Sequence, residues 1–218
     1  MAELDSSKTY LVWNGTTFPN SSSATFKAPA GSTIDWGDGT IENFEAESTE
    51  VNTHTYTDGI TEHTIAISGL TSIADSVFAG CRSLTSVTIP DGITTINRYA
   101  FDGCDNLAYN EENGLKYLGN PDNPYLYLMK ANQDIATAQI NNRCKVIGDS
   151  AFSGCRSLTS VTIGNSVTSI AASAFSYCRG LTSVTIPDSV TSIGFNAFLG
   201  CSSLTSVTMP DGITFISD

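Results

Sequence analysis

The stretch AFSGCRSLTSVTIGNSVTSIAASAFSYCRGLTSVTIP, residues 151–187, contains a pattern and its repetition. Phe152 and Phe175 lie 23 residues apart, and so do Cys155 and Cys178. The same interval leads forward to Phe198, and it also separates Phe78 from Phe101, which lie before an insertion of 28 residues. A fixed period of this length predicts a solenoid in which each repeat forms one coil.

Within one repeat, two spacings indicate two kinds of local structure. Val161 and Ile163 are two residues apart, which is the spacing of a strand with one buried face. Phe152, Cys155 and Leu158 are three apart, which suits a tight helical or 3₁₀ turn. Each repeat is therefore predicted to be a short strand followed by a turn. A single repeat cannot bury these side chains alone, so the coils must stack, with neighbouring strands about 4.8 Å apart.

One insertion interrupts the repeats at about residues 110–131. Segments 115–118 and 125–129 are strand-like, and the residues between them are rich in Gly, Asn, Pro and Asp, which favour turns. We expect a β-hairpin that projects from the solenoid. Its tyrosines Tyr117, Tyr125 and Tyr127 are candidate contacts with a partner, because exposed tyrosine is enriched at protein interfaces. The period-two spacing of Tyr125 and Tyr127 also fits packing on the coils.

Residues 1–67 do not follow the 23-residue rule. Short strands are predicted at 10–13, 24–27, 33–36, 41–44, 51–56 and 63–67. Asp38-Gly39 lies between two of them and is typical of a tight hairpin turn, since glycine accepts the positive φ that the turn needs. The fold class is thus mostly β, with a small immunoglobulin-like β-sandwich at 1–67 followed by a repeat solenoid at 68–218. No linker separates the two domains.

The net charge of −12 argues against binding to nucleic-acid phosphates. Nothing near Met1 has the charged start and apolar run of a secretory signal, so either the signal was removed or the chain is not exported by that route. No stretch approaches the length of a membrane helix, and we expect no membrane insertion.

Five of the six cysteines occupy one repeat position. They are Cys81, Cys104, Cys155, Cys178 and Cys201. The sixth, Cys144, stands where other repeats place an aliphatic residue. Free cysteine is among the most buried residue types, and metal-ligand spacings are much shorter than 23 residues. The pattern therefore favours reduced core thiols over disulfides or a metal site.

The residues that support catalysis in other proteins are scarce. The two histidines, His54 and His63, both lie in predicted strands, and no nucleophile, phosphate-loop or zinc motif is present. We expect no enzyme and no cofactor. Asp35 and Asp38 could ligate calcium, but aspartate at a tight turn more often accepts hydrogen bonds from its own backbone.

Residues that flank the buried strand positions repeat as Ser-x-Thr and form the main candidate binding face. They are Ser86, Thr88, Ser160, Thr162, Ser183, Thr185, Ser206 and Thr208. Two interpretations remain open: a solvated strand face stabilised by cross-strand contacts, and a protein-binding surface. The last coil would leave Leu204, Val207, Met209, Ile213 and Ile216 uncovered, which predicts self-association.

The repeat A-F-x-x-C-x-x-L-x-x-V-x-I-P resembles the BspA-like, or Treponema pallidum-type, leucine-rich repeats of bacterial surface proteins. The segment from Ile34 to Gly39, with His54-Thr55-Tyr56, resembles the PKD family of immunoglobulin-like domains. The resemblance implies a non-enzymatic, extracellular or cell-surface protein that binds proteins or glycans, usually in adhesion. An alternative is a structural component of a larger assembly, such as a decoration or tail protein on the virion of a gut bacteriophage.

Overall fold

The computed structural model describes residues 8–14, 23–26, 31–44, 52–55, 62–97, 99–213 and 215–216. All regular structure within these ranges is β-strand. Contacts divide the chain into two compact units, residues 1–109 with 119–121, and residues 110–118 with 122–218. Each unit is described by itself.

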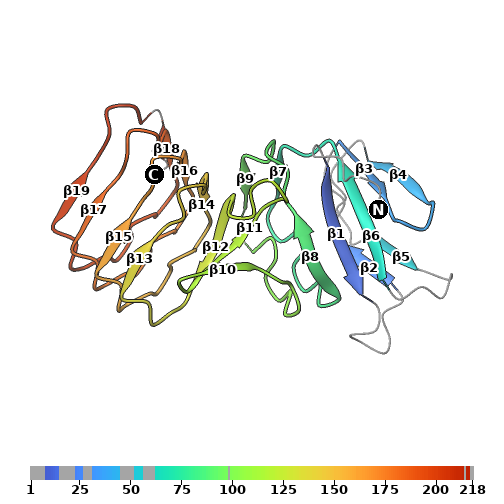
Figure 1. The fold of residues 1–218 in the computed structure, drawn as a ribbon, viewed down its shortest axis with the longest axis horizontal. Helices are drawn as coiled ribbons and strands as arrows, with labels where there is room; N and C mark the ends of the chain where they lie inside the picture. The colour runs from blue at the N-terminus through green and yellow to red at the C-terminus, as the bar shows by residue number, and fades with distance from the viewer. Residues whose placement is uncertain are drawn as a thin grey trace. The chain divides into compact units, whose positions relative to one another are not determined.

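The first unit contains two sheets of N-terminal strands (Figure 1). The larger has the order β4-β3-β6-β1-β8 and is formed by β1 (Thr9–Asn14), β3 (Ser32–Asp35), β4 (Ile41–Phe44), β6 (Glu62–Ser68) and β8 (Leu84–Thr88). The smaller pairs β2 (Ser23–Phe26) with β5 (Asn52–Thr55). The six strands predicted from the sequence are confirmed. The predicted hairpin is the antiparallel β3–β4 pair, and Gly39 in its turn has a φ of 93°.

The larger sheet continues from the N-terminal strands into the first repeat. β1 pairs antiparallel with β6 on one side and with β8, the Leu-x-x-Val strand of a repeat, on the other. Leu11 on β1 lies opposite Val87 on β8, and both side chains are buried. A shared backbone ladder therefore spans the position where the sequence showed no linker.

The first unit also contains two coils of the repeat. β7 (Ser72–Ile73) and β9 (Thr95–Ile96) pair in parallel with an offset of one repeat. The rings of Phe78 and Phe101 stack at 5.3 Å between centroids. Equivalent side chains of neighbouring coils thus lie over one another, as the 23-residue period predicts.

The second unit is a β-solenoid with two walls. One wall is a seven-stranded sheet with the order β10-β11-β12-β14-β16-β18-β20. Its strands are β10 (Asn110–Glu112), β11 (Leu115–Leu118), β12 (Tyr127–Ala131), β14 (Val146–Ile147), β16 (Ser169–Ile170), β18 (Ser192–Ile193) and β20 (Phe215–Ile216). The other wall holds β13 (Thr137–Gln139), β15 (Ser160–Thr162), β17 (Ser183–Thr185) and β19 (Ser206–Thr208).

Each complete coil therefore contributes two short strands, and the expectation of one strand and a turn is wrong. The missed strand is the Ser-Ile dipeptide, as in Ser169–Ile170, which pairs in parallel with Ser192–Ile193 of the next coil. Only one of its two residues is buried. A two-residue strand cannot show a period of two in the sequence, so the pattern gave no sign of it.

The core between the walls contains a file of aromatic rings. Phe152, Phe175 and Phe198 stack almost parallel, with centroid separations of 4.9 and 5.2 Å. Offset or parallel contacts at this distance add to the hydrophobic stabilisation of each ring. The file confirms, within this unit, the stacking that the period predicts.

The repeated cysteines lie beside the phenylalanines and serve as weak hydrogen-bond donors. The Cys178 thiol donates to the carbonyl of Phe152 at 3.1 Å, and the Cys201 thiol to the carbonyl of Phe175 at 3.0 Å. Cys104 makes the same bond to Phe78 in the first unit. All six thiols are free, and all but Cys201 are buried, so the prediction of core thiols is confirmed within each unit.

Candidate functional site

The Ser-x-Thr residues of the second unit form one exposed strand face. β13 pairs in parallel with β15, and β17 with β19, and in both pairs the partner residues are 23 positions apart in the sequence. Figure 1 shows the four strands side by side. The exposed side chains are Ser160, Thr162, Ser183, Thr185, Ser206 and Thr208. These six residues are called the hydroxyl face below. The structure thus brings together three of the four predicted pairs.

The threonine that precedes each serine of the hydroxyl face has a different role. The Thr159 hydroxyl donates to the carbonyl of Ala136 at 3.0 Å, and that of Thr205 to the carbonyl of Thr182 at 3.2 Å. Within the part of the chain that the structure describes, the hydroxyl face makes no such side-chain bond to a neighbouring coil. The first set therefore ties coils together, whereas the hydroxyls of the second set are available to a partner.

The fourth predicted pair, Ser86 and Thr88, does not belong to this face. Both residues are half-buried on β8, opposite Val12 and Tyr10 of β1. The prediction of one continuous column is wrong here, because the next repeat of the chain carries the insertion instead of a Ser-x-Thr strand. Thr88 forms an isolated parallel bridge to Gly119 rather than a ladder with a further coil.

A groove runs where the strands of the hydroxyl face end and the chain turns. Its volume is about 510 Å³, and Thr162, Thr185 and Thr208 line it from the strand ends. Asn165 and Asp188 line it from the turns. We call this the corner groove. It offers a row of hydroxyl, amide and carboxylate groups at an interval of one coil.

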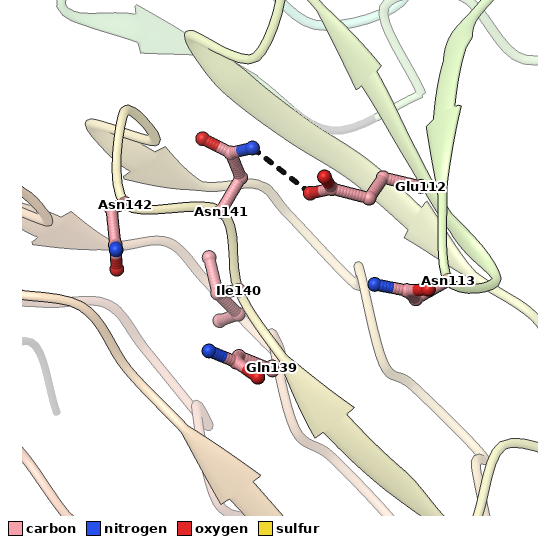
Figure 2. Close-up of a pocket in the computed structure, with 6 residues that line it drawn as sticks. All are labelled: Glu112, Asn113, Gln139, Ile140, Asn141 and Asn142. Atoms are coloured by element: carbon pink, nitrogen blue, oxygen red, sulfur yellow. Dashed lines mark hydrogen bonds between the residues drawn. The ribbon is translucent and has the colours of Figure 1, made fainter.

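A smaller hollow lies at the same corner one coil earlier (Figure 2). Its volume is about 210 Å³, and its lining is almost entirely polar. The residues that line it are Glu112, Asn113, Gln139, Ile140, Asn141 and Asn142. We call it the corner pocket. The Asn141 carboxamide donates to Glu112 Oε2 at 2.9 Å, and the Asn141 carboxamide oxygen accepts the N–H of Arg143 at 2.9 Å.

The sequence reasoning missed the residues of this pocket. Gln139 occupies the position of Thr162, and Asn142 that of Asn165, each exactly one period earlier. Carrying the 23-residue interval back from the hydroxyl face would have found them. They escaped notice because the residue types differ from Ser-x-Thr at these positions.

The insertion forms the predicted hairpin, yet it does not project. β11 and β12 pair antiparallel, and β12 continues in parallel with β14, so the hairpin is part of the solenoid wall. Tyr117 and Tyr127 are 0% and 1% exposed, and Tyr125 is half-buried. The first two tyrosines are therefore core residues and cannot contact a partner. Packing on the coils, the second interpretation of their spacing, is correct.

Tyr117 links the hairpin to the first coil that follows. Its hydroxyl oxygen accepts the backbone N–H of Asn141 at 3.1 Å, and its ring meets Tyr125 edge-on at 5.4 Å. Burial raises the pKa of this phenol to about 12. Because Asn141 lines the corner pocket, Tyr117 positions one wall of that pocket.

Replacing Tyr117 by phenylalanine is expected to lower the free energy of unfolding by about 1–3 kcal/mol, since the Asn141 N–H loses its acceptor while the ring remains. Urea denaturation of the parent and the variant measures this difference. Tyr177→Phe is the control, because Tyr177 is 48% exposed. Equal losses for the two variants would contradict a specific role for the buried hydroxyl.

In the first unit, a polar contact joins the two N-terminal sheets. His54 Nε2 lies 2.7 Å from Asp38 Oδ2, and the His54 ring stacks on Trp36 at 4.8 Å. Burial acts to raise the pKa of Asp38, but hydrogen bonds from His54 and Thr40 outweigh it and lower the pKa to about 2. The histidine thus has a positioned partner that the sequence did not reveal.

The two turn aspartates accept backbone hydrogen bonds, as the sequence predicted. Asp35 accepts the N–H of Gly37, and Asp38 the N–H of Thr40, each at 3.0 Å. Among the described residues, no group of three or more His, Cys, Asp and Glu side chains is arranged to hold a metal ion. Nor does the described part of the chain contain a helix with the length and hydropathy that crossing a membrane requires.

The last coil exposes apolar residues that are covered in earlier coils. Val207 and Met209 are 39% and 43% exposed, whereas their counterparts Val184 and Ile186 are 3% and 2% exposed. Leu204 and Ile213 are half-buried against the core. The side chain of Ile216, which was also expected to be uncovered, lies outside the described residues.

A family model described as "BspA type Leucine rich repeat region" matches residues 43–120 and 127–218 in six copies. Among solved structures, the chain is similar to a leucine rich cell surface protein from Faecalibacterium prausnitzii A2-165, with 31% identity over 63% of this chain and 36% of that one, and a TM-score of 0.33. It is also similar to a leucine-rich repeat protein from Bacteroides ovatus ATCC 8483, with 23% identity over 85% and 54% and a TM-score of 0.40.

A third similar structure is the leucine rich repeat protein of T. pallidum, with 23% identity over 73% of this chain and 69% of that one, and a TM-score of 0.30. The chain spans 36% and 54% of the lengths of the first two structures. No curated protein matches the chain significantly.

Proposed function

Because the chain belongs to the BspA-type leucine-rich repeat family, we propose that it is a non-enzymatic protein of the cell surface or extracellular space that binds an extended protein or glycan ligand. The hydroxyl face and the corner groove are its binding surface. The observation that carries the proposal is the set of exposed Ser-x-Thr hydroxyls on in-register strands, beside a groove of about 510 Å³.

Repetition of the same groups supports this type of recognition. Ser183 lies opposite Ser206, and Thr185 opposite Thr208, so successive coils present identical groups at one fixed interval. An extended partner that contacts several coils binds more strongly than any single contact allows, because later contacts form at a high effective concentration. The surface location follows from the resemblance of the repeats to those of bacterial surface proteins.

The N-terminal strands form a PKD-like domain that ends at residue 67 in this proposal. Its support is the β3–β4 hairpin with Asp38-Gly39 in the turn, and the placement of His54 on β5 against Asp38. The ladder between β1 and β8 joins this domain to the first repeat through a rigid junction.

Self-association through the last coil is a further part of the proposal. Val207, Met209 and the half-exposed Phe195 and Leu199 are apolar groups that a second copy could cover. Light scattering at increasing protein concentration tests it, and a strict monomer at high concentration would contradict it.

Placing charge on the hydroxyl face is expected to abolish binding of an extended ligand. The double variant Ser160→Glu with Ser206→Glu adds two carboxylates to exposed positions two coils apart. The matched control is Ser157→Glu with Ser203→Glu, which has the same charge and spacing and is also exposed, but lies outside the hydroxyl face. Binding to a panel of immobilised glycoproteins, mucin and fibronectin among them, should fall at least about tenfold for the first variant only.

Loss of binding in both variants would indicate a general effect of charge. Unchanged binding in both would place the interaction elsewhere on the molecule and overturn the proposal. Thermal unfolding of each variant checks that the solenoid is intact.

A further inference from the structure

We propose that the corner pocket is a glycan subsite that takes one neutral sugar unit. This inference rests on the proposed binding function, and it names both the class of ligand and the place where that ligand is recognised. Nothing in the family match assigns a ligand to Gln139, Asn142 or Glu112.

The chemistry of the pocket matches vicinal hydroxyl groups. Asn113, Gln139 and Asn142 each present a carboxamide, with two N–H donors and an acceptor oxygen. Figure 2 shows that the only hydrogen bond among the lining residues joins Asn141 to Glu112, so these three carboxamides are not bonded to one another. A sugar hydroxyl donates one hydrogen bond and accepts others, and it can therefore pair with either end of a carboxamide.

Hydrogen bonds fix the position of Asn141 in the pocket wall. The Asn141 backbone N–H is bound to the buried Tyr117 hydroxyl, and its side chain is bound to Glu112 and to the Arg143 N–H. Asn113 has a φ of 51°, in the left-handed region, where it closes the β10–β11 turn at the rim. Asparagine tolerates this conformation better than most residues. The pocket wall is thus preorganised, which lowers the entropy lost on binding.

Size and charge exclude other kinds of ligand. A volume of about 210 Å³ is smaller than the pockets of drug-sized molecules and suits a single ring. The polar lining offers little to an apolar side chain of a peptide. Glu112 contributes the only charge among the lining residues, so a sugar that carries a carboxylate is repelled. A single carboxylate among amides is also a weak site for a metal cation.

The corner pocket borders the coil that contributes Asn165 to the corner groove. A Cβ at Gly164 would lie 3.2 Å from the Asn142 carboxamide oxygen, so the turn of the next coil passes directly beside the pocket residue. Asn142 and Asn165 occupy the same repeat position, as do Gln139 and Thr162. A glycan chain seated in the pocket therefore continues along groups of the same kind. None of the six lining residues is aromatic, so a single sugar binds weakly, with a Kd of about 1 mM or higher.

The test is a titration of the whole ¹⁵N-labelled chain, followed by NMR. The probes are galactose, mannose, fucose, N-acetylglucosamine, N-acetylgalactosamine, and their disaccharides, with sialyllactose as the anionic member. We expect at least one neutral sugar to shift the side-chain amide signals of Asn113, Gln139 and Asn142. Lactose should bind at least tenfold more tightly than sialyllactose if galactose is that sugar.

Two variants decide whether the pocket holds the sugar. Gln139→Ala with Asn142→Ala removes two exposed carboxamides and should abolish the titration. Asn132→Ala removes one exposed carboxamide outside the pocket and should leave it unchanged. The inference is overturned if no sugar shifts the pocket signals, or if the double variant binds like the parent.

The same variants separate this inference from the proposed function. If glycoprotein binding is lost in Ser160→Glu with Ser206→Glu but retained in Gln139→Ala with Asn142→Ala, the hydroxyl face is the binding surface and the corner pocket is not a subsite of it. If a sugar binds in the corner pocket but no glycoprotein binds to the hydroxyl face, the subsite is supported and the proposed function is contradicted.

Discussion

Replacing Phe175 by alanine is expected to lower the free energy of unfolding by about 3–5 kcal/mol, the usual cost of removing a fully buried phenylalanine. Its ring is 0% exposed and lies between Phe152 and Phe198 at 4.9 and 5.2 Å. The variant loses the transfer free energy of the ring and leaves a cavity, and both neighbouring rings lose a stacking partner. In a solenoid each coil contacts mainly its neighbours, so a defect in a central coil weakens two interfaces.

The matched control is Phe195→Ala in the next coil. Phe195 is 49% exposed, and its loss should cost about 1 kcal/mol or less. Guanidinium denaturation followed by far-UV circular dichroism measures both variants. The chain has two tryptophans, Trp13 and Trp36, both in the first unit, so tryptophan fluorescence reports that unit separately. Equal losses at the two positions would contradict the buried file.

Raising the pH above 9 is expected to destabilise the second unit steeply. Burial raises the pKa of Cys144 and Cys178 to about 12 and that of Cys155 to about 11. An unfolded thiol ionises with a pKa of about 8.5–9. Between these values the unfolded chain releases protons that the folded chain retains. The free energy of unfolding is therefore unaffected below about pH 8.5 and falls by about 1.4 kcal/mol per pH unit for each such thiol above it.

The variant Cys144→Val isolates one of these thiols. Valine already occupies this repeat position at Val167 and Val190, and both side chains are buried, so the substitution should cost less than about 1.5 kcal/mol at neutral pH. Between pH 9 and 11 the unfolding free energy of the variant should fall less steeply than that of the parent. The difference between the two slopes should be about 1.4 kcal/mol per pH unit, the contribution of one thiol. Denaturation curves at intervals of half a pH unit give this slope. A slope identical to that of the parent would show that Cys144 does not titrate with folding.

Much of the solenoid follows from the spacing of residues alone. The 23-residue interval predicted the Phe152–Phe175–Phe198 file and the repeated thiols of Cys178 and Cys201 beside it, because stacked coils must place equivalent residues over one another. Local turn chemistry predicted the β3–β4 hairpin in the same way, since Asp38-Gly39 permits few other conformations.

The hairpin and the candidate site show where such reasoning fails. Leu115 and Tyr117, and likewise Tyr125 and Tyr127, are two residues apart, which predicts the strands of a hairpin but not what it packs against. In the structure β12 adds to the edge of the solenoid wall through β14, and this pairing buries Tyr117 and Tyr127. Ser86 and Thr88 match the repeat pattern equally well, yet β8 pairs with β1 of the N-terminal strands.

The sequence by itself determined the period, the inward positions of the coils, and the residues that stack, because these depend only on intervals along one chain. The tertiary structure alone decided which backbone edges pair. Edge pairing satisfies the N–H and C=O groups that every strand carries whatever its side chains, so residue types do not specify the partner. The corner pocket depends on such a pairing, since the β10–β11 turn brings Glu112 and Asn113 to Asn141 of a later coil.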